Sequence, residues 1–311
     1  MRSSSPLVLG LVLLAASARA QQPAPQPAQG FAVERFYLSA PGGGWFIMDS
    51  LEMHGGLGGA VNLTVGYERN ALRLTEGAQT LDVVQTRAFL DVGGAVTYGC
   101  WRFYLNLDFP LATYGNSGTL GDYSYTGPSL NLASNPDTLS DARLGVDVRI
   151  IGAPADAFRL GAGVQLFVPS GTRADYDTDG TFRAMVRVLV AGDVGLFTYA
   201  GQLGLHIRPL DNYPIPGSPE GSELLFGGAA GVRLPVGTLA FVAGPEVYGA
   251  TAFRTFFASS STALEGLLTL RLEGTGEGAQ LRFKLAGGGG LNPQFGAPEW
   301  RVVLAIELFD Y

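Results

Sequence analysis

The chain has 311 residues and a net charge of −7; 47% of its residues are hydrophobic, 15% are charged and 45 are glycine. Its basic residues are scattered rather than clustered, which argues against a nucleic-acid partner. The single cysteine, Cys100, excludes an intramolecular disulfide. Past the amino terminus no stretch approaches the roughly 18 consecutive apolar residues that indicate a membrane helix.

Residues 1–20 have the pattern of a secretory signal peptide. Arg2 provides the positive start, an apolar core follows, and Ala18-Arg19-Ala20 is a small-x-small cleavage site. Residues 21–30 alternate proline with Gln and Ala, which predicts an extended linker. The pattern therefore predicts an exported protein of the cell envelope.

Residues 31–52 form an apolar segment interrupted by the glycine run Gly42–Gly44. Several interpretations are open for it. The segment can enter the lumen of a barrel as a plug, lie against the barrel as a periplasmic lead-in, or add strands. The sequence alone does not choose between them.

The stretch 141–171 shows the pattern that repeats through the remaining chain. From Ala142 to Ile150, and again from Phe158 to Val168, every second residue is apolar. Successive side chains of a strand point to opposite faces, so each run predicts an amphipathic strand. Each run is also about as long as a tilted strand that crosses a membrane, roughly 9–11 residues. Residues 53–311 are therefore expected to form one β-domain of about twelve strands, at 53–68, 81–97, 101–111, 141–152, 157–168, 181–191, 196–208, 222–234, 238–249, 262–273, 279–289 and 298–310.

The connections between these strands alternate strictly between long and short. The short ones are 98–100, 153–156, 192–195, 235–237 and 274–278. The longer ones are 69–80, 112–140, 169–180, 209–221, 250–261 and 290–297. Short periplasmic turns and long external loops are typical of outer-membrane barrels, whereas a soluble sandwich has no reason to sort its loops in this way. We therefore predict an all-β, antiparallel, up-and-down transmembrane β-barrel in the outer membrane, with both termini on the periplasmic side.

Charged residues occupy the face of the strands opposite to the apolar one. A midplane Arg or Lys facing lipid costs about 2–4 kcal/mol, so this face is expected to line a hydrated lumen. Arg87, Asp91, Asp141, Arg301 and Glu307 belong to it. The residues selected as pore-lining candidates are Arg102, Asp108, Arg143, Asp147, Arg149, Arg159, Arg183, Arg187, His206, Glu246, Glu265, Arg271, Arg282 and Lys284.

Motifs for catalysis and metal binding are weak. The two histidines, His54 and His206, accompany neither a Gly-x-Ser-x-Gly nor a His-Glu-x-x-His motif, so we expect no enzymatic activity and no cofactor. Asp175, Asp177 and Asp179 precede a glycine as at the start of an EF-hand loop, but the full motif requires a Glu where Val186 stands. These three carboxylates are a weak calcium candidate in an external loop; a solvated acidic loop is the simpler interpretation.

Several segments together resemble the barrel portion of OmpA-family outer-membrane proteins. They are 31–36, 45–50, 67–72, 139–144, 166–171, 221–226 and 295–300. The resemblance covers nearly the whole mature chain. In that family the barrel is commonly followed by calcium-binding repeats and a peptidoglycan-binding domain, which we do not expect here.

These observations favour a passive, porin-like channel for small solutes. The alternative is a structural or adhesive OmpA-like barrel, its lumen closed by ion pairs. A barrel enzyme is a third possibility, supported only by the existence of other enzymatic barrels. The expected partners are outer-membrane lipid, lipopolysaccharide and, during biogenesis, the barrel-assembly machinery.

Overall fold

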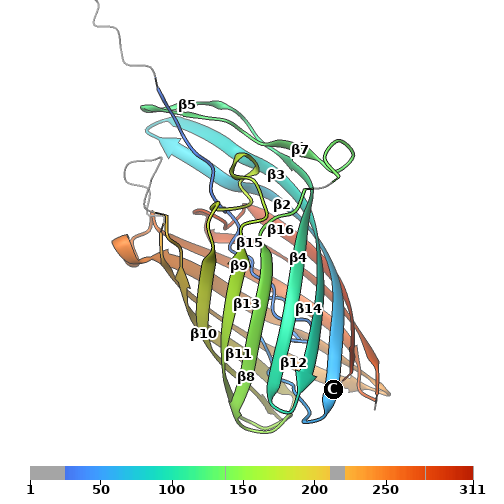
Figure 1. Cartoon of the computed structure of the whole chain (residues 1–311). Coiled ribbons are helices and arrows are strands. Elements are labelled where there is room, and N and C mark those ends of the chain that lie inside the picture. Colours follow the sequence, from blue (N-terminus) through green and yellow to red (C-terminus); the bar gives the residue numbers. More distant parts are fainter. Residues whose placement is uncertain (1–24, 137, 211–220, 277, 311) are drawn as a thin grey trace, which may run out of the picture.

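The computed structural model describes residues 25–136, 138–210, 221–276 and 278–310. Within these ranges, twelve long antiparallel strands form one closed barrel (Figure 1). They are β2 (Leu57–Glu76), β3 (Gln79–Tyr98), β4 (Trp101–Tyr114), β8 (Ala142–Ile151), β9 (Arg159–Val168), β10 (Arg183–Val194), β11 (Phe197–Ile207), β12 (Glu223–Val236), β13 (Leu239–Ala252), β14 (Thr262–Gly274), β15 (Gln280–Asn292) and β16 (Trp300–Asp310). No helix in the described part of the chain is long and apolar enough to cross a membrane.

Each barrel strand pairs with its neighbours in chain order, and the last strand pairs with the first. The register of β16 against β2 runs from Trp300 opposite Arg69 to Asp310 opposite Gly59. This pairing closes the sheet and leaves it without edges. The predicted antiparallel up-and-down barrel is confirmed.

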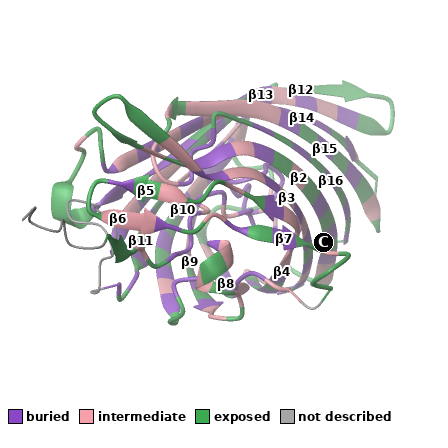
Figure 2. Ribbon diagram, turned by 90° about the horizontal axis from the view of Figure 1, so that it is seen from above, coloured by how far each residue is buried: buried purple, intermediate pink, exposed green. Residues whose placement is uncertain are grey.

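Alternation along the strands separates an outer apolar face from an inner polar one. On β16 the side chains of Val302, Leu304 and Ile306 are exposed, whereas those of Arg301 and Glu307 are buried. Figure 2 shows the same alternation of exposed and buried residues on neighbouring strands. An exposed belt of Val, Leu and Ile is the surface that membrane barrels present to lipid.

Apart from the β2–β3 connection, the two ends of the barrel differ as predicted in the length of their connections. At one end the strands are joined by tight turns, in which Gly99, Gly195 and Gly237 adopt positive φ angles of about 60° (63, 62 and 63°) that favour glycine. We refer to this end as the short-turn end and to the other as the long-loop end.

One predicted loop is wrong. Residues 69–80 are not a loop, because β2 and β3 continue through them and turn only at Gly77 and Ala78. The extension has an apolar face of its own. Leu72 and Val83 belong to a buried cluster with Phe31 and Tyr176, so pairing these residues as strands covers the segment that enters the barrel.

The long-loop end carries a small three-stranded sheet. It consists of β1 (Gln26–Pro27), β6 (Tyr123–Tyr125) and β5 (Gly118–Leu120), and β7 (Ser129–Asn131) pairs with β4 nearby. The remaining elements are the short 3₁₀ helices η1 (Arg173–Asp175) and η2 (Phe253–Thr255). The N–H groups of Gln26 and Ala28 donate to carbonyls of the 112–140 loop at 2.8 Å each. The amino-terminal part of the described chain is thereby fixed at the long-loop end.

The two ends of the described chain therefore lie at opposite ends of the barrel (Figure 1). β16 finishes at the short-turn end, as expected, but the amino-terminal part does not. In the described residues the chain enters between the long loops and passes through the barrel before β2 begins. Residues 1–24 lie outside the described residues, so the expectation that both termini lie on one side stays a prediction. The predicted signal peptide, residues 1–20, lies outside the described residues.

Candidate functional site in the barrel lumen

Residues 31–53, here called the lumen segment, occupy the interior of the barrel. Trp45, Phe46, Ile47 and Met48 have 0–1% of their surface exposed. They pack in one apolar cluster with inward-facing residues of β10, β11, β12, β13, β14, β15 and β16, among them Leu189, Ala200, Ala229, Val242, Leu267, Ala286 and Val303. The lumen in this structure is a packed interior and not an open pore.

Glycines on the inner wall make room for the large side chains of the lumen segment. A Cβ at Gly231 on β12 would come within 2.7 Å of the Trp45 ring, and one at Gly161 on β9 within 2.8 Å of Leu51. Contacts this short are not tolerated. The same Cβ atoms would also lie within 2.7 Å of the Ala243 carbonyl oxygen and 2.8 Å of the Val148 carbonyl oxygen, respectively, so a side chain at either position would force the segment and the wall apart. Part of the high glycine content is therefore explained by close approach of the segment to the wall.

The backbone of the lumen segment is anchored by a buried carboxylate on β13. Glu246 accepts hydrogen bonds from the N–H groups of Phe46 at 3.0 Å and Ile47 at 2.9 Å. Thr269 on β14 donates its hydroxyl to the same carboxylate at 2.6 Å. Glu246 is fully buried. It supplies acceptors to N–H groups that have no strand partner, and buried N–H groups left without acceptors are costly.

Ion pairs join the lumen segment to the wall. Near the long-loop end, Glu34 accepts from Arg87 at 2.8 Å and from Arg301 at 3.1 Å. Asp49 pairs with Arg102, which also contacts Asp147 at 3.0 Å. Removing one member of such a buried set leaves an uncompensated charge, which typically costs about 3–5 kcal/mol. The pairs therefore fix the position of the segment in the barrel.

All fourteen pore-lining candidates belong to the inner face, and Asp108 and Arg149 are half-buried while the other twelve are buried. The structure joins several of them directly or through a shared carboxylate. Arg187 contacts Asp147 at 2.8 Å, and Arg282 and Lys284 share Glu307 at 2.9 and 2.7 Å. Others pair with residues outside that set, such as Arg159 with Asp193 at 2.8 Å and Arg271 with Glu273 at 3.0 Å. Their role as the lining of a passage stays a prediction.

Sequence reasoning missed the charged residues of the lumen segment itself. Glu34, Arg35 and Asp49 are not among the candidates, yet each forms an ion pair with a strand residue; Arg35 contacts Glu223 at 2.6 Å. The available signal was the occurrence of four charged residues, these three and Glu52, in a largely apolar stretch. Their partners are 53 to 267 positions away in sequence, so the pattern could not identify them.

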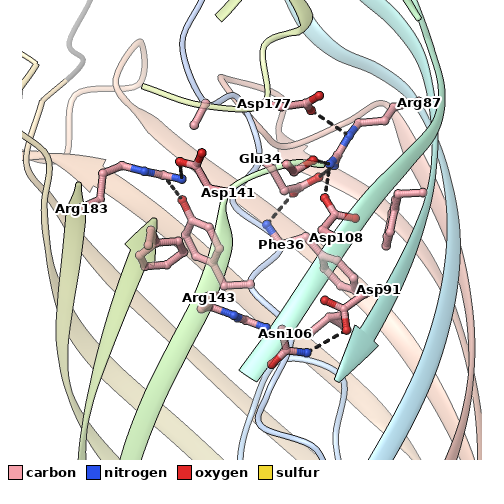
Figure 3. Close-up of a pocket in the computed structure, with 16 residues that line it drawn as sticks. Glu34, Phe36, Arg87, Asp91, Asn106, Asp108, Asp141, Arg143, Asp177 and Arg183 are labelled. Atoms are coloured by element: carbon pink, nitrogen blue, oxygen red, sulfur yellow. Dashed lines mark hydrogen bonds and ion pairs between the residues drawn. The ribbon is translucent and has the colours of Figure 1, made fainter. Parts of the chain in front are cut away.

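A small pocket of about 70 Å³ lies between the lumen segment and the wall formed by β3, β4, β8, β9 and β10. At its upper part in Figure 3, Glu34, Asp108 and Asp177 surround Arg87. Arg143 lies deeper, near Asn106. Phe36, Tyr37 and Phe167 supply apolar surface. The pocket therefore combines charges of both signs with an aromatic wall.

Two of the three proposed calcium ligands lie close to arginine side chains. Asp179 accepts from Arg208 at 2.7 Å and from the N–H of Ala32 at 2.9 Å, while Asp177 lies 3.7 Å from Arg87. Among the described residues, no group of three His, Cys, Asp or Glu side chains is arranged to hold a metal ion. The calcium site therefore has no support in the geometry, because two of its carboxylates face cations that the sequence pattern could not reveal.

The two aspartates have opposite electrostatic environments. Burial, together with Asp108, Asp175 and Asp141 nearby, raises the pKa of Asp177 to about 7 despite the opposing effect of Arg87. Burial also disfavours the charged form of Asp179, but Arg208 and Arg183 outweigh it and hold the pKa of Asp179 well below its usual range. Near neutral pH, Asp179 is thus a fixed charge and Asp177 titrates.

His206, the histidine considered for catalysis, is fully buried on β11. Its ring packs against those of Tyr37 and Phe167, with centroid distances of 5.4 and 5.1 Å, and these two rings also contact each other at 5.0 Å. Its Nδ1 atom is 3.6 Å from Glu223. The aromatic enclosure gives His206 a packing role at the seam between lumen segment and wall.

Comparison with known proteins bears on the fold. No protein-family model matches the chain, and no curated protein matches it. Among solved structures, an outer membrane channel from Pseudomonas putida F1 is similar at a TM-score of 0.50 with 14% identity, covering 82% of this chain and 95% of that one. The NanC porin aligns at a TM-score of 0.46 with 9% identity, over 81% of this chain and 99% of that one.

The chain has the fold of an outer-membrane β-barrel. The predicted resemblance to the OmpA family is supported only as far as the outer-membrane β-barrel fold, since no match to that family was found. Identities this low carry no information about solutes or partners.

Proposed function

We propose that this protein is an outer-membrane channel for small solutes whose lumen is occupied by its own amino-terminal segment. The observation that supports this most strongly is the construction of the interior. A charged inner wall encloses a segment that is not a strand of the barrel and is attached mainly through side chains. Displacing that segment would leave a closed barrel lined by the charged residues predicted from the sequence.

The barrel sheet does not depend on the lumen segment for its backbone hydrogen bonds. The twelve strands pair with one another around the full circle. The segment can therefore move without opening the sheet, and its release would require breaking the Glu246 and Asp49 contacts. Such a release is a conformational equilibrium with a small open population, and permeability would follow that population.

Swelling of liposomes that contain the purified full-length protein tests this function. Isosmotic small solutes should enter these liposomes faster than protein-free liposomes, and loosening the segment by Glu246→Ala should increase the rate. Swelling at the protein-free rate for both proteins would reject a channel.

The packed interior also favours a second candidate, a structural or adhesive barrel that never opens. The apolar cluster around Trp45 and the buried ion pairs leave little free space in the lumen. In that case the 112–140 loop and its small sheet would be the functional surface. A deletion strain with impaired envelope integrity and unchanged solute uptake would favour this candidate over the channel.

We further propose that the long-loop end faces the exterior and the short-turn end the periplasm. Long external loops are typical of outer-membrane barrels. The described amino-terminal residues would then lie outside the cell and the carboxyl end in the periplasm. An epitope tag placed directly before Pro25 should be accessible to antibody on intact cells, whereas a tag after Tyr311 should not; the reverse pattern would invert the orientation.

The partners follow from the same placement. The exposed Val, Leu and Ile of the outer face would contact lipid and, at the long-loop end, lipopolysaccharide. Insertion would require the barrel-assembly machinery, with β16 as the closing strand. Depletion of that machinery should leave the chain outside the membrane fraction; undiminished insertion would contradict this.

A further inference from the structure

Arg143 on β8 differs from the other buried arginines of the inner wall. Arg87, Arg102, Arg183, Arg187 and Arg301 each lie within 4.0 Å of at least one carboxylate. Arg143 is only 5% exposed, yet its side chain forms neither an ion pair nor a hydrogen bond with another described residue, and its Nη1 atom is buried without a partner. A buried guanidinium without an anion is costly, so the site favours an anionic ligand.

Figure 3 shows where this guanidinium lies. Arg143 points into the pocket near Asn106 and carries none of the marked contacts that join the other charged residues. Asp91, the carboxylate that influences it most, instead accepts from Asn106 at 2.7 Å. The guanidinium is thus available to a molecule that enters the pocket.

Unsatisfied groups of opposite sign lie in the same pocket, toward the long-loop end. Asp108 has one carboxylate oxygen, Oδ1, without a partner, and Asp177 has one as well, Oδ2. In the register of β4 against β8, Asn106 is directly opposite Arg143, and Asp108 is two residues farther along β4. Diagonal positions of this kind have Cα atoms about 7–8 Å apart.

The geometry points to a binding site for a small zwitterion, a solute with a carboxylate and an ammonium group of the amino-acid class. Its carboxylate would be held by Arg143, and its ammonium by the free oxygens of Asp108 and Asp177. Phe167 and Tyr37 would cover the hydrocarbon part. Guanidinium binds carboxylate through paired, charge-assisted hydrogen bonds, which provides orientation as well as affinity. The inference rests on the proposed function, since it names the class of solute that such a channel would admit.

Isothermal titration calorimetry of the detergent-solubilised full-length protein tests the site with three probes: L-alanine, acetate and methylammonium. L-alanine should bind at least about tenfold more tightly than either of the singly charged probes, corresponding to about 1.4 kcal/mol. Acetate binding as tightly as L-alanine, or no L-alanine binding, would overturn the assignment.

Variants separate the two halves of the site. Arg143→Gln should weaken L-alanine binding about tenfold or more. Arg143→Lys should weaken it less, because the positive charge is kept although the planar, bidentate guanidinium is lost. Asp177→Asn should weaken L-alanine binding and leave acetate binding unchanged. The matched control is Arg73→Gln, which removes an arginine that pairs with Asp82 outside the lumen and should change nothing. L-alanine binding that is the same in all variants would refute the site.

Two safeguards keep the test decisive. Folding of each variant is checked by its shift in gel mobility on heating, and if Arg143→Gln does not fold, Arg143→Lys and Asp177→Asn carry the test. Liposome swelling is measured in parallel. Swelling without L-alanine binding refutes this site alone, whereas L-alanine binding without swelling refutes the channel alone.

Discussion

Replacing Glu246 by alanine should release the lumen segment. The substitution leaves the N–H groups of Phe46 and Ile47, which donate at 3.0 and 2.9 Å, without acceptors inside the barrel. A hydrogen bond to a buried charged group contributes about 1.5–3 kcal/mol, so the two together stabilise the occupied state by about 3–6 kcal/mol. The population of barrels with a displaced segment should therefore rise by about 10²–10⁴-fold.

This release can be measured by cysteine labelling. Ser50, 1% exposed in the lumen segment, is replaced by cysteine in a Cys100→Ser background, and the rate of reaction with a water-soluble maleimide is followed. When opening and closing are faster than labelling, the rate follows the open population. The control is Glu299→Ala, since Glu299 contacts Asn70 and Arg73 and not the segment. Equal labelling rates with and without Glu246 would refute the reasoning.

Three further changes test other parts of the account. Arg102→Ala leaves Asp49 and Asp147 as buried carboxylates without this partner, which should lower the stability of the folded barrel by about 3–5 kcal/mol. The temperature at which the heat-dependent shift in gel mobility occurs should therefore fall; an unchanged temperature would show that the pair contributes nothing. Gly231→Val places a side chain against Trp45 and should expose Trp45 to aqueous quenchers, whereas unaltered quenching would contradict the close approach. The pKa of Asp177 is raised from its usual value to about 7. Between about pH 4 and 7 the folded state therefore keeps a proton that the unfolded state has lost, and stability falls as the pH rises. In Asp177→Asn, protease resistance of the 169–180 loop should lose that pH dependence, and a pH dependence that persists in the variant would assign the effect to another group.

Much of the barrel could be predicted because its determinants are local. The alternation from Ala142 to Val168 is visible in the sequence and defines both the strands and their inward face. The alternating connection lengths predict the up-and-down topology, in which each barrel strand pairs with its neighbour in the chain. Burial of charged residues such as Arg102 and Lys284 follows from the same pattern.

The parts that could not be predicted depend on contacts between distant residues. The extension of β2 and β3 through 69–80 covers Phe31, which is far away in sequence. The entry of the chain at the long-loop end depends on two backbone hydrogen bonds from Gln26 and Ala28 to the 112–140 loop. Neither arrangement leaves a periodic signal. The ion pairs likewise required the register between strands to be known.

Single-channel current recording can show whether the lumen segment closes the barrel, by comparing the full-length protein with a chain that lacks residues 25–52. The barrel strands pair without that segment, so the shortened chain should insert and give large, steady conductance. The full-length protein should show a nearly closed baseline with rare openings. Equal conductance of the two proteins would contradict the account, because the segment would then not be what occupies the passage.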